Sequence, residues 1–195
     1  IKPILMHVAA LAFILLFPII WSVWCYNNYI EDGVPVDVVV IQPNVDTYQK
    51  FVAADPFEQT QLLIDLAASV ADSNVDIFVA PETAINNNIW LDKLDRSRDL
   101  RYIRQFVNNY PQSGFIVGIT GYKRYDEASK TATARPLGNS PFYYDSFNSA
   151  IQIDTTDTIQ IYHKSQLVVG VEKLPYPEYL QILRKLTLNL GGTFR

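Results

Sequence analysis

The chain has 195 residues, of which 49% are apolar, and a formal net charge of −4. An acidic chain without a basic patch argues against nucleic-acid binding, and this apolar fraction argues against disorder. A single cysteine argues against an intramolecular disulfide framework and a thiolate zinc site.

Residues 1–30 are predicted to form a transmembrane helix. No Asp, Glu, Lys or Arg occurs between Pro3 and Ile30, and residues 4–25 are nearly all apolar. About 20 such residues span the hydrocarbon core of a bilayer. A buried globular helix and a cleaved signal peptide are the alternatives. The length disfavours the first, and Trp and Tyr residues at the expected cleavage position disfavour the second.

The flanks of this segment predict its orientation. Lys2 precedes it and two acidic residues follow Ile30, so the positive-inside tendency places the N-terminal flank in the cytoplasm and the remaining residues outside. The chain starts without Met and stops at Arg195 after a Gly-Gly pair, and we therefore expect it to be a fragment of a longer protein. Cys25 and His7 lie in the apolar segment and are read as packing residues.

Residues 31–195 show the pattern of an α/β domain. Apolar runs predict buried strands over 36–41, 77–80 and 115–120. Apolar residues at helical spacing predict helices over 56–73 and 100–107, with Asp55 as the N-cap of the first. This β-α-β-α-β order is typical of layered α/β domains.

The pattern changes after the third strand. Residues 123–140 are polar and rich in Ala, Thr and Gly, which predicts a long exposed loop. Residues 142–144, 149–154 and 158–162 then predict a meander of short strands.

Three charged residues are candidates for chemistry. Glu82 follows the predicted strand 77–80, Lys164 follows the strand 158–162, and Glu172 comes eight residues later. Taken singly, each is more often a solvated charge than a functional one. Ligands in open α/β sheets gather at the carboxyl ends of the strands. A carboxylate and an ammonium at one such edge would supply a general base and an oxyanion stabiliser.

Other catalytic signatures are missing from the sequence. It has no Gly-x-Ser-x-Gly, no glycine-rich phosphate loop and no spacing of His, Cys and Asp that suits a metal. The residues themselves therefore give no indication of a metal site. His163 is interpreted as a surface or packing histidine.

These segments resemble the nitrilase (carbon–nitrogen hydrolase) superfamily and, within it, the bacterial apolipoprotein N-acyltransferases. The resemblance depends on a strand that ends in Gln42-Pro43-Asn44, on Ala-Pro-Glu-Thr around Glu82, and on Tyr-His-Lys-Ser around Lys164, in this order behind a membrane span. It covers nearly all of the chain. It implies an α-β-β-α sandwich, truncated here, preceded by one transmembrane helix.

The resemblance also implies roles for the three charged residues. Glu82 matches the catalytic glutamate, Lys164 the catalytic lysine, and Glu172 a further essential glutamate of a Glu-Lys-Cys triad that uses no cofactor. The family's nucleophilic cysteine lies downstream of the lysine and would follow Arg195, and Cys25 cannot replace it. We therefore expect residues 31–195 to be the N-terminal part of a catalytic domain and the chain alone to be inactive.

The activity implied by the resemblance is acyl transfer between lipids. The acyl chain would pass from a phospholipid, through a cysteine thioester, to the N-terminal amine of diacylglyceryl-cysteine in an apolipoprotein. The catalytic domain would lie on the periplasmic side of the bacterial inner membrane. Two alternatives stay open: a membrane-tethered amidase of the same superfamily that hydrolyses a small amide, and a catalytically inactive, membrane-anchored binding module.

Overall fold

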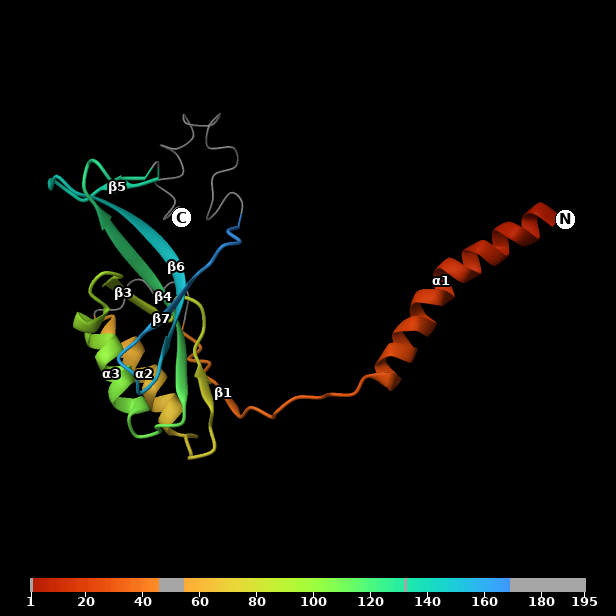
Figure 1. Cartoon of the computed structure of the whole chain (residues 1–195), viewed down its shortest axis with the longest axis horizontal. Helices are drawn as coiled ribbons and strands as arrows, with labels where there is room; N and C mark the ends of the chain where they lie inside the picture. Colours follow the sequence, from red (N-terminus) through yellow and green to blue (C-terminus); the bar gives the residue numbers. More distant parts are fainter. Residues whose placement is uncertain (1, 46–54, 132, 169–195) are drawn as a thin grey trace. The chain divides into compact units, whose positions relative to one another are not determined.

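The computed structural model describes residues 2–45, 55–131 and 133–168 and divides into two units, Ile1–Pro35 and Val36–Arg195 (Figure 1). The first unit contains helix α1, Lys2–Asn28, which has Pro18 in its interior. The most apolar 18-residue window within Pro3–Asn28 has a mean hydropathy of 2.5, and none of that window is buried. The ring Nδ1 of His7 forms a hydrogen bond with the backbone carbonyl of Pro3, at 2.6 Å. By length and composition, α1 fits a membrane anchor or a signal sequence.

The second unit is built on a mixed sheet. Within the described residues, the sheet has the strand order β1-β2-β4-β6-β5, with β3 also beside β4 and β7 also beside β6. The strands are β1 (Val38–Val40), β2 (Ile77–Val79), β3 (Ile85–Trp90), β4 (Gly114–Tyr125), β5 (Arg135–Pro136), β6 (Tyr143–Ile153) and β7 (Gln160–His163). The helices are α2 (Phe57–Ala68), a 3₁₀ turn η1 (Leu94–Arg96) and α3 (Arg98–Val107).

Two long antiparallel strands, β4 and β6, form the centre of the sheet. They pair from Phe115↔Ile153 to Tyr125↔Tyr143. Each has two short strands along its outer side: β2 and then β3 along β4, and β7 and β5 along β6. Strand β7 is antiparallel to β6, and β6 is antiparallel to β4, so β7 runs in the same direction as β4. Because β2 is parallel to β4, β7 also runs in the same direction as β2. The carboxyl ends of β2 and β7 therefore point toward the same edge, as the sequence predicted for the segments before Glu82 and Lys164.

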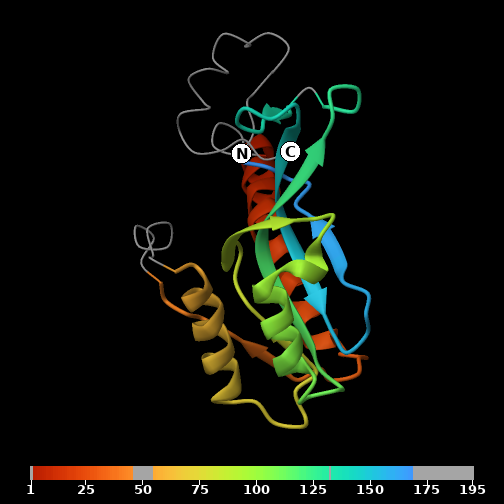
Figure 2. The ribbon, with the colours of Figure 1, turned by 90° about the vertical axis from the view of Figure 1, so that its left-hand side faces the viewer.

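Helices α2 and α3 pack side by side on one face of the sheet (Figure 2). The core between them is formed by Phe78, Phe115, Val117, Ile119, Ile151 and Ile153 from the strands and by Leu63, Ala67, Ile103 and Val107 from the helices. A buried carboxylate joins these elements, since Asp99 of α3 accepts hydrogen bonds from Thr60 of α2 at 2.6 Å and from Asn87 of β3 at 2.7 Å.

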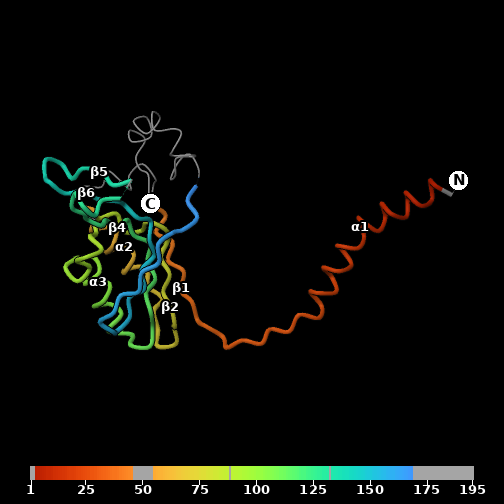
Figure 3. Tube along the Cα trace, turned by 45° about the horizontal axis from the view of Figure 1, so that its top comes forward, coloured from red at the N-terminus to blue at the C-terminus, as the bar shows by residue number. Residues whose placement is uncertain are grey.

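The opposite face of the sheet is open. Strand register directs Val38, Val40, Ile116, Ala150 and Tyr162 to this side, which we call the open face. Val40 is 72% exposed and Tyr162 is 65% exposed. Figure 3 shows β1 beside β2 at the margin of the sheet. In the described part of the chain, apolar strand residues therefore face outward on the side without helices.

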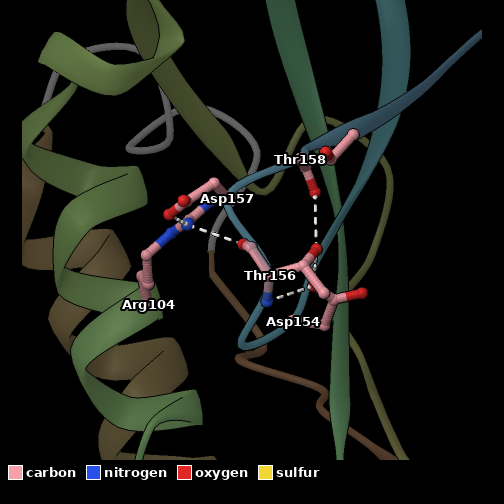
Figure 4. A network of polar contacts seen from close by, with 5 residues as sticks. All are labelled: Arg104, Asp154, Thr156, Asp157 and Thr158. Carbon is pink, nitrogen blue, oxygen red and sulfur yellow. Dashed lines mark hydrogen bonds and ion pairs between the residues drawn. The ribbon is translucent and has the colours of Figure 1, made fainter.

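A polar network fixes the turn between β6 and β7 to helix α3 (Figure 4). Arg104 donates to the carbonyl of Thr156 at 2.7 Å and lies 3.7 Å from the Asp157 carboxylate. Asp154 accepts from the backbone N–H of Thr156 at 2.8 Å and from its hydroxyl at 2.5 Å. The hydroxyl bond and then the backbone bond lower the pKa of Asp154. The turn thus positions β7, which leads directly to Lys164.

The predicted strands and helices near the N-terminal end of the domain are confirmed within a few residues. The first helix starts at Phe57, and the carboxylate of Asp55 accepts the N–H of Phe57 at 3.0 Å although the capping position itself is Pro56. The predicted strand 115–120 is longer, because β4 runs on to Tyr125. The mixed α/β class is therefore correct.

Two predictions for the second half are wrong. The predicted loop 123–140 contains the end of β4 and strand β5, and the predicted strands 142–144 and 149–154 are one continuous strand, β6. The polar residues between them are buried and bonded: Asp145, for example, is 4% exposed and accepts from Thr131 at 2.6 Å and Thr133 at 2.9 Å. Buried polar groups with partners do not interrupt a strand.

Candidate active site

Glu82 lies in a bulge of the chain that packs over β4 between strands β2 and β3. Strand β2 ends at Val79, and Pro81 follows, which has no N–H to continue a ladder. The carbonyl of Pro81 accepts the N–H of Gly118 at 3.2 Å, and Thr83 adopts a positive φ of 48°. The segment therefore bulges from the sheet edge over Gly118 of β4 and returns to the same edge, where β3 starts at Ile85.

Gly118 permits this bulge. A Cβ at this position would lie 2.6 Å from the Cα of Glu82, from the carbonyl oxygen of Pro81 and from the N of Thr83. All three are backbone atoms, which cannot move aside as a flexible side chain can. The position of Glu82 thus depends on the missing side chain of a residue 36 positions further along the chain.

We expect Gly118→Ala to displace Glu82 and to destabilise the domain by roughly 1–3 kcal/mol, since it forces backbone apart in a packed region. Any activity that uses Glu82 should fall by more than about tenfold, because small misplacements of a catalytic group are costly. Gly114→Ala is the matched control on the same strand, where a Cβ would meet only the side chain of Gln152, at 3.5 Å. Unfolding midpoints and activity of both variants test this, and equal behaviour would contradict it.

Lys164 reaches Glu82 from the other side of the central pair of strands. It directly follows β7, and its backbone N–H donates to the carbonyl of Asn148 at 2.9 Å. Its Nζ lies 3.2 Å from Oε1 of Glu82, although the two residues are 82 positions apart in the chain. The Glu82 side chain is 58% exposed and that of Lys164 is 30% exposed. The structure therefore brings together two of the three residues that the sequence singled out.

Asn148 is a third member of the site that sequence reasoning did not single out. It lies in β6, is 5% exposed, and its Nδ2 donates a short hydrogen bond to Oε1 of Glu82. The donors from Asn148 and Lys164 thus converge on one carboxylate oxygen. The sequence did contain a signal, the polar Asp-Ser-Phe-Asn-Ser run at 145–149. Most of this run was predicted to lie between two separate strands, so Asn148 was not recognised as a strand residue.

A hollow of about 200 Å³ adjoins Glu82. Its lining includes Gln42 and Asn44, the two residues on which the family resemblance at the end of the first strand depends, together with Pro81 and Ala84. Asn44 has a positive φ of 49°, a conformation that asparagine tolerates better than most residues. The first strand therefore ends beside the candidate site.

Of the remaining residues that the sequence raised, Glu172 lies outside the described residues. Cys25 is exposed on α1, in the other unit. Within residues 2–45, 55–131 and 133–168, no three His, Cys, Asp or Glu side chains are grouped as ligands of a metal ion.

His163 faces away from the site. Its Nδ1 lies 2.7 Å from the hydroxyl of Ser149, and its ring is 4.7 Å from that of Phe147. Burial and then the charge of Lys123 lower its pKa below the ordinary value of 6.5. Side chains of neighbouring residues therefore lie on opposite faces of the sheet. Asn148 and Lys164 lie on the open face, and Ser149 and His163 lie on the other face.

This shift gives a pH dependence of stability. Because the folded state disfavours the imidazolium, the unfolded chain binds the proton more readily, and stability should fall as the pH drops below 6.5. His163→Gln keeps a partner for Ser149 but does not titrate. We expect the loss of thermal midpoint between pH 7.5 and 5.5 to be smaller in this variant, whereas His7→Gln should behave as wild type. An unchanged acid loss in His163→Gln would contradict this.

No protein-family model matches the chain. The chain is similar to an apolipoprotein N-acyltransferase of Chlorobaculum tepidum, with 23% identity over 186 residues. The similarity covers 90% of this chain but 33% of the relative, so the chain spans about a third of the length of that protein. The resemblance to apolipoprotein N-acyltransferases inferred from the sequence is confirmed as a distant and partial relationship.

Proposed function

We propose that this chain is part of a membrane-bound apolipoprotein N-acyltransferase and carries the base and the lysine of its Glu-Lys-Cys triad. The observation that carries the proposal is the 3.2 Å approach of Lys164 Nζ to Glu82 Oε1 at the carboxyl ends of two strands that run in the same direction. Sequence position and family resemblance predict both residues independently of this distance. The distant relationship to an acyltransferase supports the same activity.

The proposed architecture is one half of a nitrilase-like α-β-β-α sandwich. Residues 1–30 would be the last membrane span, and residues 31–195 the N-terminal part of the catalytic domain. Two features support this: the helices cover one face of the sheet, and the open face carries exposed Val40 and Tyr162 beside the candidate site. A second sheet on the open face would bury these side chains.

In the first half-reaction, Glu82 acts as general base. It takes the proton of a cysteine thiol located after Arg195, and the thiolate attacks the sn-1 ester carbonyl of a phospholipid. The Lys164 ammonium stabilises the negative charge that develops on the carbonyl oxygen. When the tetrahedral intermediate collapses, the ester C–O bond breaks, the proton on Glu82 passes to the leaving lysophospholipid oxygen, and a thioester remains.

The second half-reaction uses the same groups. The α-amine of diacylglyceryl-cysteine at the start of an apolipoprotein attacks the thioester carbonyl, and Lys164 again stabilises the oxyanion. The amine loses its proton to Glu82, the C–S bond breaks, and the thiol is re-formed beside an N-acylated lipoprotein. Glu172 would support the triad or shape the loop that covers it.

The membrane location suits these substrates. Both the phospholipid donor and the apolipoprotein acceptor are held in a bilayer, so an anchored enzyme meets them by diffusion in two dimensions. We propose that α1 lies in the bacterial inner membrane and that the catalytic domain lies on its periplasmic side. The apolar character of α1, whose most apolar 18-residue window has a mean hydropathy of 2.5, supports an anchor.

The test is acyl-enzyme formation by the full-length protein in phospholipid vesicles that carry a labelled sn-1 acyl chain. We expect a hydroxylamine-sensitive label on the protein, and its transfer to a synthetic diacylglyceryl-cysteine peptide. Hydrolysis of small amides without any protein-bound acyl chain would support the amidase instead. Neither reaction, with binding of the lipopeptide alone, would point to an inactive binding module.

A further inference from the structure

We propose that Asn148 is a positioning residue that holds the Glu82 carboxylate in the orientation required for proton transfer. This inference rests on the proposed function, because it gives Glu82 the role of general base. Asn148 touches neither substrate nor nucleophile in this scheme and acts through Glu82.

Asn148 contacts both halves of the charge pair. Its side-chain amide donates to Oε1 of Glu82, and its backbone carbonyl accepts the N–H of Lys164 at 2.9 Å. Strand register places it opposite Thr120 of β4, in the middle of the central ladder. One rigid residue therefore sets the positions of a carboxylate from one edge of the central strands and of a lysine from the other.

The Asn148 amide and the Lys164 ammonium, the two donors to Glu82, differ in how deeply they are buried. The Asn148 residue is 5% exposed, whereas the side chain of Lys164 is 30% exposed and carries its charge on a flexible four-carbon stem. A partly exposed ion pair is weakened by solvent and salt and costs side-chain entropy. A short amide fixed within a strand does not titrate and has little freedom to lose. Asn148 is thus the donor better suited to fix the direction of the carboxylate.

The chemistry of a general base requires such a neutral donor. Glu82 has to alternate between ionised and protonated forms during each half-reaction. An amide N–H donates to either form, but more strongly to the carboxylate, because hydrogen bonds to an ionised acceptor are the stronger ones. The amide therefore keeps the base oriented throughout the cycle while favouring the ionised state that accepts the thiol proton.

The near-isosteric variant Asn148→Asp distinguishes positioning from simple packing. It places a second carboxyl group against Glu82, and the two groups then titrate as a coupled pair. While the pair holds one proton, Asp can donate to Glu82 as the amide does. Once that proton is lost, the donor is gone and like charges face each other. We expect the ratio of variant to wild-type acylation rate to fall as the pH rises.

The truncation Asn148→Ala should lower the acylation rate by about 10- to 100-fold, the scale expected when a catalytic group is misplaced. Ser149→Ala is the matched control, since Ser149 is a neighbouring, 2% exposed polar residue that faces the other side of the sheet. Its acylation rate at pH 8 should match wild type. A pH-independent ratio for Asn148→Asp together with less than a threefold effect of Asn148→Ala would overturn the proposal.

A readout without substrate separates this inference from the proposed function. The carboxylate band of Glu82 can be identified in infrared spectra of ¹³C-glutamate-labelled protein as the band missing from Glu82→Gln. We expect Asn148→Ala to raise the pH at which this band titrates, and Ser149→Ala to leave it in place. A shifted band in a protein that forms no thioester would support Asn148 and refute the acyltransferase; an unshifted band in an active protein would refute Asn148 alone.

Discussion

Glu82→Gln in the full-length protein is expected to lower the rate of thioester formation with phospholipid by at least about 10³-fold, within the range found for loss of a general base. The amide has nearly the shape of the carboxylate, and its oxygen can still accept hydrogen bonds from Asn148 and Lys164. It cannot take a proton from a thiol. Single-turnover labelling with an acyl-labelled phospholipid measures this rate directly.

Glu58→Gln is the control for this substitution. Glu58 is an exposed carboxylate in the first turn of α2 and does not line the hollow beside Glu82. We expect its variant to acylate at the wild-type rate, and both variants to show the wild-type circular dichroism spectrum. A normal yield of acyl-enzyme from Glu82→Gln would remove Glu82 from the mechanism.

Lys164→Ala is expected to lower the same rate by about 10²- to 10³-fold, the loss seen when one oxyanion donor is removed from an acyl-transfer site. The loss should be in the rate constant at saturating phospholipid rather than in lipid affinity, because the charge on the carbonyl oxygen develops only in the transition state. Lys164→Arg keeps a cation and should recover part of the rate. Single-turnover rates over a range of phospholipid density separate the two effects.

Lys93→Ala is the matched control, since Lys93 is an exposed lysine at the start of η1. We also expect Glu82→Gln combined with Lys164→Ala to be little slower than Glu82→Gln alone, because residues that act as a unit are not additive. A full additive loss, or wild-type acylation by Lys164→Ala, would contradict the shared site.

The charge pair could be predicted from sequence because of a simple geometric rule. Glu82 and Lys164 each follow an apolar run, and strands that run in the same direction bring their carboxyl ends to one edge. The runs themselves were recognisable, because the β-branched segments 36–41, 77–80 and 115–120 have no competing helical pattern. Residue type and position after a strand therefore made both residues candidates, and the family resemblance singled them out as a pair.

The rest of the site could not be predicted because it depends on long-range partners. The Asn-rich strand β3 has low intrinsic strand propensity, and its Asn87 is bonded to buried Asp99 of α3. The partner of the Asn148 side chain, Glu82, lies 66 positions earlier in the chain. Gly118 in the sequence is one glycine inside an apolar strand, with nothing nearby to show which backbone it admits.

The close backbone contact at Gly118 has a consequence for how this protein would tolerate random mutation. In a saturation library scored by cell survival, Gly118 should be as intolerant as Glu82, although it contributes no atom to the reaction. A reader of such a map alone would count Gly118 among the chemical groups. The contacts of 2.6 Å that a Cβ would make explain the intolerance as steric: the backbone that carries the base can pack against β4 there only because Gly118 has no side chain.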